Sequence, residues 1–188
     1  MINVCVTGHR PSNPNLGGYD WNSDKNQRIM LKLYQTVEDI LKENPNETIN
    51  CIEGGALGID QMFFRSCEVL RVKYPDKITL EVAIPFKNQA NKWFNKTDID
   101  RYYKQVLIAD DVTFVDELKK YHLKGIENEV YHPAKMQKRN MYMVDKADIV
   151  IAVWDGSKGG TGNCVNYAKK VNKKKYYKNR SKRGVMLC

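Results

Sequence analysis

The segment from Arg139 to Thr161, RNMYMVDKADIVIAVWDGSKGGT, predicts a helix, a buried strand and a glycine-rich loop that opens onto another helix. Residues 148–154 are almost entirely apolar, as expected of a parallel strand that is covered on both faces. The loop 155–161 follows where this strand ends, and ligands of open α/β sheets bind beyond the carboxyl ends of the strands. Glycines allow close backbone approach and a helix start offers unpaired N–H groups, so the loop predicts an anion or nucleotide cradle. The alternative is an ordinary glycine-rich turn.

Two earlier segments repeat this succession of strand, glycine-containing loop and helix. A strand over 2–6 is followed by TGHRP, residues 7–11, in which Thr7 and Gly8 precede Arg10, whose guanidinium could bind a phosphate or remain a solvated turn residue. A strand over 49–52 is followed by EGGALGID, residues 53–60. Loops from neighbouring strands face one ligand across the sheet edge, but the G-x-G-x-x-G fingerprint of dinucleotide-binding folds is absent.

Polar side chains in the second loop have more than one interpretation. Glu53 ends a strand, where a carboxylate could bind ribose hydroxyls, perform acid–base chemistry or form a surface salt bridge. Asp60 could contact the ligand or cap the next helix. Gly54 and Gly55 would offer backbone N–H groups to the same ligand. We expect this loop and the loop 155–161 to share one site.

Further patterns complete an alternating β/α order. We expect strands at 78–84 and 111–115, helices at 23–42, from 60 to before Pro75, at 98–109, from 133 and from 161, and a polar, irregular segment at 116–132. The helix from 133 should turn Met136, Asn140, Met143 and Ala147 inward, and the helix at 98–109 should bury Ile99, Tyr102 or Tyr103, and Val106. Such alternation predicts a three-layer α/β/α sandwich with a mostly parallel sheet. We expect one domain over 1–172, and a basic tail over 173–188 that could end in a short edge strand at 184–187.

Composition and residue spacing indicate where the protein resides and whether it holds a metal. The 188 residues include no apolar run long enough to span a bilayer, and the N-terminus shows no signal-peptide pattern, so we expect a cytoplasmic protein without a membrane partner. Five cysteines and three histidines share no ligand spacing, which favours buried thiols and no metal site.

The net charge of +9 is concentrated near the C-terminus. Nine Lys and Arg residues lie between 169 and 183 with no acidic residue among them, and the rest of the chain is balanced. With Tyr176 and Tyr177 interleaved, this segment could bind nucleic acid, or it could be a solvated helix end and tail.

The motifs around Gly8, at 53–60 and at 139–161 together resemble the YpsA-like branch of the SLOG superfamily. The resemblance covers most of residues 1–170. It implies a Rossmann-like fold, a nucleotide or nucleotide-derived ligand at the strand ends, no required cofactor, a homo-oligomer and a bacterial or phage origin. The superfamily includes cytokinin-activating phosphoribohydrolases, DNA-processing protein A and molybdenum-cofactor carriers.

Comparison with the phosphoribohydrolases implies that Arg139, Gly159, Gly160 and Thr161 hold a phosphate. In those enzymes the motif continues with two glutamates, which are replaced here by Asn163 and Cys164. Asparagine can orient a ribose hydroxyl but cannot supply the charge that stabilises an oxocarbenium-like state. The replacement therefore favours a binding protein over a hydrolase.

Three functional hypotheses follow. The first is a binding module for a nucleotide or nucleotide-derived signal, such as an ADP-ribose-like compound, acting as a sensor or sequestering protein. In it Arg10 and Arg139 contact phosphate, and Glu53 and Asp60 contact ribose. Backbone N–H contacts come from Gly54, Gly55, Gly159, Gly160 and Thr161. The second is a nucleotide N-glycosidase or deoxyribosyltransferase that uses Glu53 or Asp155. The third is nucleic-acid binding through the basic tail.

Overall fold

Five strands pair in parallel to form the central sheet of the computed structural model, which describes residues 1–171 and 186–187. A sixth strand of two residues pairs antiparallel with β5 at one edge, so the order is β4-β3-β2-β1-β5-β6. The strands are β1 (Ile2–Gly8), β2 (Ile49–Glu53), β3 (Ile78–Ile84), β4 (Asp111–Phe114), β5 (Ile149–Trp154) and β6 (Met186–Leu187). The predicted edge strand at 184–187 is thus present at 186–187, and residues 172–185 and 188 lie outside the described residues.

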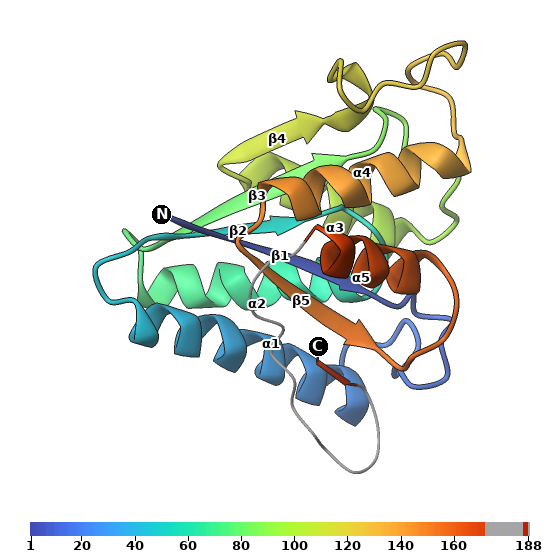
Figure 1. Cartoon of the computed structure of the whole chain (residues 1–188). Helices are drawn as coiled ribbons and strands as arrows, with labels where there is room; N and C mark the ends of the chain where they lie inside the picture. The colour runs from blue at the N-terminus through green and yellow to red at the C-terminus, as the bar shows by residue number, and fades with distance from the viewer. Residues whose placement is uncertain (172–185, 188) are drawn as a thin grey trace.

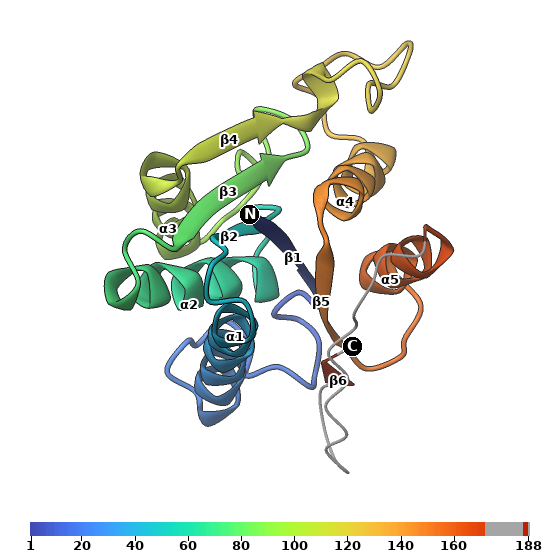
Figure 2. The ribbon, with the colours of Figure 1, turned by 60° about the vertical axis from the view of Figure 1, so that its left-hand side comes forward.

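Helices cover both faces of this sheet. Helices α1, α2 and α3 lie on one face and α4 and α5 on the other, as the two ribbon views show (Figures 1 and 2). Their bounds are α1 (Asp24–Glu43), α2 (Ile59–Lys73), α3 (Lys96–Ile108), α4 (Pro133–Lys146) and α5 (Gly160–Lys170), with a short 3₁₀ helix at Val115–Glu117. The prediction of a Rossmann-like three-layer sandwich with a mostly parallel sheet is confirmed.

The order of the strands places the switch point of the fold beside β1. From β1 the chain builds β2, β3 and β4 outward on one side, and then crosses back to place β5 on the other side of β1. Loops that follow β1 and β5 therefore diverge to opposite faces of the sheet. In sheets of this kind the crevice between such loops is where ligands bind.

The apolar periodicity of α1 and α2 predicts their buried faces correctly. Of the α1 residues that repeat at helical spacing, Leu33, Val37 and Ile40 are completely buried and Met30 is partly buried. The apolar residues at helical spacing in α2 are all completely buried, namely Ile59, Met62, Phe63, Cys67 and Leu70. Ser23 accepts a hydrogen bond from the backbone N–H of Asn26 and caps α1 as predicted. The core between these helices and the sheet is therefore an ordinary apolar one.

Two helices bury a face that the pattern of apolar residues does not predict. In α3 the buried residues are Asp98, Tyr102 and Gln105, so the prediction is confirmed for Tyr102. Ile99 and Val106 are only partly buried, and Val106 packs against the core. The buried positions within α4 are Lys135, Arg139, Met143 and Val144. Lys135 and Arg139 are buried because each forms an ion pair, Lys135 Nζ with Asp116 Oδ2 at 3.0 Å and Arg139 with Asp60.

Cysteines 5, 51, 67 and 164 are buried, in agreement with the prediction from their scattered positions. Within residues 1–171 and 186–187, no group of three or more His, Cys, Asp or Glu side chains could hold a metal ion. None of the helices in this described part is long and apolar enough to cross a membrane.

Candidate functional site

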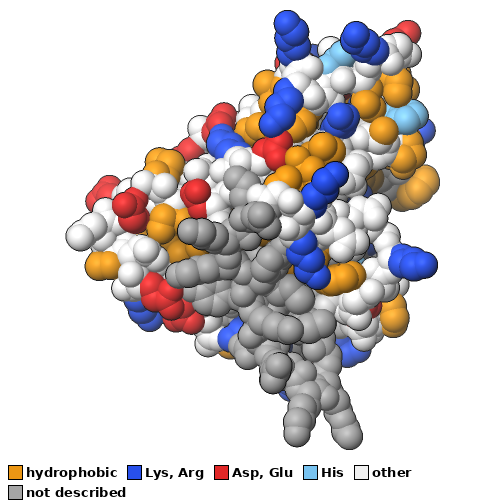
Figure 3. All heavy atoms as spheres, in the orientation of Figure 1, with side chains coloured by type: hydrophobic (Ala, Val, Ile, Leu, Met, Phe, Trp, Pro, Cys, Tyr) orange, Lys and Arg blue, Asp and Glu red, His pale blue; other side chains and the backbone are white. Residues whose placement is uncertain are grey.

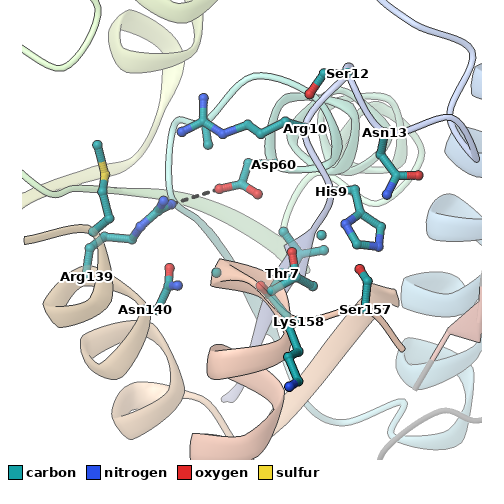
Figure 4. Close-up of a pocket in the computed structure, with 16 residues that line it drawn as sticks. Thr7, His9, Arg10, Ser12, Asn13, Asp60, Arg139, Asn140, Ser157 and Lys158 are labelled. Carbon is teal, nitrogen blue, oxygen red and sulfur yellow. Dashed lines mark hydrogen bonds and ion pairs between the residues drawn. The ribbon is translucent and has the colours of Figure 1, made fainter. Parts of the chain in front are cut away.

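A cavity of about 410 Å³ opens at the carboxyl ends of β1 and β5, between the starts of α2 and α5 and the side of α4. Seven residues predicted for the ligand site line it: Thr7, Gly8, Arg10, Asp60, Arg139, Gly160 and Thr161. In the close-up, Arg10, Asp60 and Arg139 lie on one side, and His9, Ser157 and Lys158 lie on the other (Figure 4). Segments distant in sequence thus meet at the switch point of the sheet.

A buried ion pair joins α2 to α4 at the floor of this cavity. Arg139 Nη1 donates to Asp60 Oδ2 at 2.8 Å, and both side chains are less than a tenth exposed. Gly54 leaves room for the guanidinium, since a Cβ built on this glycine would lie 1.1 Å from Arg139 Nη1. Arg139 Nε has no hydrogen-bond partner in the structure, so the guanidinium keeps unused donor capacity.

Positive charge exceeds negative charge in the lining. Arg10, Arg139 and Lys158 face a single carboxylate, that of Asp60, which Arg139 already neutralises. The carbonyl oxygen of Arg10 accepts the backbone N–H of Asn13, but its guanidinium makes no hydrogen bond or ion pair with any described residue. Partial loss of hydration, followed by the positive charge of Arg139, lowers the pKa of Arg10. An anion placed here would relieve the repulsion between the two guanidinium groups.

The two helices that begin at the cavity have no side-chain cap. The N-terminal residues Gly58 of α2 and Gly159 of α5 provide no capping side chain, whereas Ser23, Asn95 and His132 accept backbone N–H bonds at the starts of α1, α3 and α4. Unpaired N–H groups and the positive end of the helix dipole favour an anion at such a position. This feature points to the same ligand charge as the arginines.

Gly58 also sets the distance between the first two loops. Its φ of +97° lies in the region that favours glycine, and a Cβ there would lie 2.6 Å from the carbonyl oxygen of His9. Ile59 N donates to that same oxygen at 3.3 Å. The start of α2 is therefore joined to the loop after β1, and this places Arg10 near Asp60.

One of the two predictions for Asp60, that it caps α2, is wrong. The N-cap position is occupied by Gly58, and the Asp60 carboxylate is held by Arg139 instead. Six other predicted residues do not line the cavity: Glu53, Gly54, Gly55, Asp155, Gly159 and Asn163. The contacts of Glu53 and Asp155 show what these two carboxylates do within the protein.

Glu53 lies beneath the loop rather than at its surface. Its side chain is completely buried, and its Oε2 accepts the backbone N–H of Gly55 at 2.6 Å, so this N–H is not available to a ligand. Burial, reinforced by the negative charge of Asp60, raises the pKa of Glu53 to about 8, although the Gly55 N–H and Arg139 oppose this shift. Near neutral pH the carboxyl group is therefore mostly protonated.

Asp155 is engaged in holding two loops together. Its carboxylate accepts the backbone N–H of Ser157 at 3.0 Å and the side-chain amides of Asn13 and Asn15 at 3.1 and 2.9 Å. His9 Nε2 lies 3.0 Å from Asp155 Oδ1. Hydrogen bonds from Ser157, followed by Asn13, lower the pKa of Asp155. The residue thus fixes the loop after β1 against the loop after β5.

The raised pKa of Glu53 predicts a stability that falls as pH rises. The folded state holds the Glu53 proton up to about pH 8 and the unfolded chain releases it near the ordinary value of 4.5. Between these pH values the folded state binds more protons, so the Glu53 contribution decreases by up to about 1.4 kcal/mol per pH unit. We expect Glu53→Gln to flatten the decline in urea denaturation measured at pH 5, 7 and 9.

The exposed Glu117→Gln is the matched control for this experiment, because it removes a carboxylate of the same type from the surface. It should reproduce the pH dependence of the unchanged protein. Parallel curves for the Glu53→Gln variant and the unchanged protein would contradict the raised pKa.

Sequence reasoning missed several lining residues: His9, Ser12, Asn13, Asn140, Ser157 and Lys158. Four of them lie inside the motifs 7–11 and 139–161 that the prediction relied on, where they could have been included as neighbours. Ser12 and Asn13 belong to the loop after β1, whose path over the cavity depends on the contacts of Asp155.

Comparison with known proteins agrees with the motifs. The YpsA family model, described as the YspA SLOG family, matches residues 4–182. The chain belongs to this SLOG family. The SPbeta prophage-derived protein YoqJ of Bacillus subtilis strain 168, itself uncharacterized, is 44% identical over 146 residues, which cover 77% of this chain and 82% of YoqJ. A UPF0398 protein of Bacillus cereus strain B4264 is 27% identical over 161 residues, covering 84% and 77% of the two chains.

A solved structure with a similar fold belongs to DNA processing protein A of Helicobacter pylori, studied for its single-stranded DNA binding mode. The TM-score is 0.53 at 14% identity, and the match covers 92% of this chain and 62% of that one. At this identity the likeness to the SLOG relative shows the shared fold alone.

Proposed function

We propose that this chain binds a nucleotide or nucleotide-derived small molecule through its phosphate, as a sensor or sequestering protein. The observation that carries the proposal is the Arg10 guanidinium, which lies in the cavity beside Arg139 without a partner among the described residues. An anion in the cavity would offset the positive charge of the two neighbouring guanidinium groups, whose geometry matches that of phosphate oxygens.

The backbone supports the same ligand class. Gly160 and Thr161 line the cavity at the uncapped start of α5, and Ala56 and Asp60 line it at the uncapped start of α2. Two helix N-termini and two guanidinium groups around one cavity favour a phosphate over a neutral sugar or base. The phosphate would lie against α5 and Arg10, and Asp60 would be near the ribose.

Carboxylate placement favours binding without turnover. Cleavage of an N-glycosidic bond needs a carboxylate near the anomeric carbon. Glu53 is buried and mostly protonated near neutral pH, Asp155 is held by four partners, and Asp60 is paired with Arg139. Neither of the two catalytic candidates lines the cavity, so an N-glycosidase or deoxyribosyltransferase is the less favoured activity.

Nucleic acid is a second candidate partner, because a structural neighbour of this chain binds single-stranded DNA and nine basic residues lie between 169 and 183. On the face shown in Figure 3, the described Lys and Arg side chains are spaced among acidic, hydrophobic and uncharged ones. A continuous basic track of the kind that follows a nucleic-acid backbone is not formed by the described residues on that face. The small-molecule ligand is preferred because two guanidinium groups and two uncapped helix starts meet around one cavity.

The proposal is tested with a ligand panel in which thermal shift and release of free base are recorded together. The panel contains AMP, NAD, ADP-ribose, adenosine, and single-stranded DNA at two salt concentrations. A ligand present at 100 times its dissociation constant should add about 2.7 kcal/mol of stability. We expect stabilisation by phosphorylated compounds, with the ligand recovered intact.

Other outcomes of the panel each favour a different function. Free base that accumulates with turnover would replace the binding function by N-glycosidic cleavage. Stabilisation by DNA alone, lost at the higher salt concentration, would favour nucleic-acid binding instead.

A further inference from the structure

A second cavity of about 490 Å³ adjoins the first on the side of β3 and the irregular segment 116–132. Arg10 and Met136 line both cavities, so the two are neighbouring chambers around one arginine. We call the first the phosphate chamber and the second the aromatic chamber, after the residues described next. The family motifs at 7–11, 53–60 and 139–161 contribute only Arg10 to the aromatic chamber.

Three aromatic side chains line the aromatic chamber: Phe86, Trp93 and Tyr131. Phe86 and Tyr131 meet edge to face with ring centroids 6.1 Å apart, and Trp93 is braced edge to face against Tyr102 at 5.3 Å. Tyr131 is about half exposed, so a large part of its surface remains available to a ligand. Aromatic rings with free surface bind flat ring systems by stacking.

Amide groups supply the polar part of the lining, from Asn88, Gln89 and Asn91. Gln89 Nε2 donates to the carbonyl oxygen of Gly55 at 2.7 Å, which fixes the orientation of the amide. Its other atom, Gln89 Oε1, is buried and has no hydrogen-bond partner. Side-chain amides next to stacking surfaces can pair with the polar edge of a nucleobase.

The segment that carries Tyr131 is fixed by a buried lysine. Lys135 Nζ donates to the carbonyl oxygens of Glu127 and Asn128 at 2.6 and 2.9 Å, and to Asp116 Oδ2 at 3.0 Å. These bonds tie an irregular segment to α4, one turn before Arg139 on the same helix. Tyr131 lies between this bonded segment and the start of α4, the helix that carries Arg139.

We propose that the aromatic chamber holds the base of the nucleotide whose phosphate occupies the phosphate chamber. This inference rests on the proposed function and narrows it, because it requires a ligand with an anionic end and an aromatic end. A sugar phosphate would fill only the phosphate chamber. Arg10, at the boundary, would lie beside the sugar–phosphate part of the ligand.

The test compares AMP with ribose 5-phosphate by calorimetric titration of the full chain and of Tyr131→Ala. Base–aromatic stacking contributes enough that its loss should weaken AMP binding about tenfold. The affinity for ribose 5-phosphate should stay unchanged in this variant. Tyr103→Ala is the matched control, since Tyr103 is also about half exposed and lines neither chamber.

Each outcome of this experiment decides the inference. AMP binding that exceeds ribose 5-phosphate binding, and that only Tyr131→Ala reduces, supports it. Equal affinities for the two ligands, or an equal loss for both in Tyr131→Ala, would overturn the aromatic chamber while leaving the phosphate site in place. Absence of binding by both ligands would overturn the proposed function and the inference with it.

Discussion

Replacing Arg139 with methionine should lower the free energy of unfolding by about 3–5 kcal/mol and remove nucleotide binding. Asp60 would be left buried without a counter-charge, since Arg139 Nη1 at 2.8 Å is its ion-pair partner in the structure. Methionine retains much of the volume of the arginine stem, so the loss reports the charge rather than a cavity. Urea denaturation at pH 7 measures the change in stability, and titration with AMP measures the change in binding.

Two further variants separate the ion pair from general damage to α4. Lys138→Met removes a charge from the neighbouring position and should change stability by less than about 0.5 kcal/mol. Combining Asp60→Leu with Arg139→Met removes both charges and should recover much of the lost stability, but not the binding. An Arg139→Met protein as stable as the unchanged one would show that the pair does not hold α2 to α4.

Replacing Arg10 with alanine should weaken AMP binding by about 10- to 100-fold, as expected for the loss of hydrogen bonds to a charged group. Stability should change by less than about 0.5 kcal/mol, because Arg10 is exposed at the cavity and has no partner among the described residues. The effect of Arg10 on binding is thus separable from folding, which is not true of Arg139.

Arg28→Ala provides the matched control, since Arg28 is an exposed arginine on α1 that lines none of the described cavities around the site. It should bind AMP like the unchanged protein. Equal losses in the two variants would indicate a general electrostatic effect of net charge instead of a contact.

The strands and their glycine loops could be predicted from sequence because each is determined locally. An apolar run such as 149–154 has few alternatives to a buried parallel strand, and a glycine loop after it lies at the sheet edge by topology. The same reasoning places Arg10 at the sheet edge, whereas the role of Arg139 is implied by the resemblance to the phosphoribohydrolases. The expected bounds of the strands differ from the observed ones by only a few residues.

The interior of the site could not be predicted because it depends on pairs far apart in the chain. Asp60 and Arg139 are 79 positions apart, and nothing local indicates that one neutralises the other. For the same reason the buried face of α4 is predicted only in part: Met143 and Ala147 are buried as expected, but Met136 and Asn140 are only partly buried. Burial of Lys135 and Arg139 in their place requires Asp116 and Asp60, which apolar periodicity does not register.

The roles of Glu53 and Asp155 could not be predicted from sequence for the same reason. A carboxylate at a strand end looks like a ligand contact in sequence, yet Glu53 turns under its loop to accept the Gly55 N–H, and Asp155 collects hydrogen bonds from the loop after β1. Segment 116–132 has no periodic pattern, so the position of Tyr131 follows from tertiary contacts, namely the bonds of Lys135 to this segment and the packing of Tyr131 on Phe86.

The most direct test of the central claim is the comparison of AMP with adenosine in the ligand panel, because the two differ only in the phosphate. The arrangement of Arg10, Arg139 and the two uncapped helix starts predicts that AMP binds and stabilises the protein and that adenosine binds at least about tenfold more weakly. Adenosine bound as tightly as AMP, or no binding of any phosphorylated compound, would contradict a phosphate site at the ends of β1 and β5.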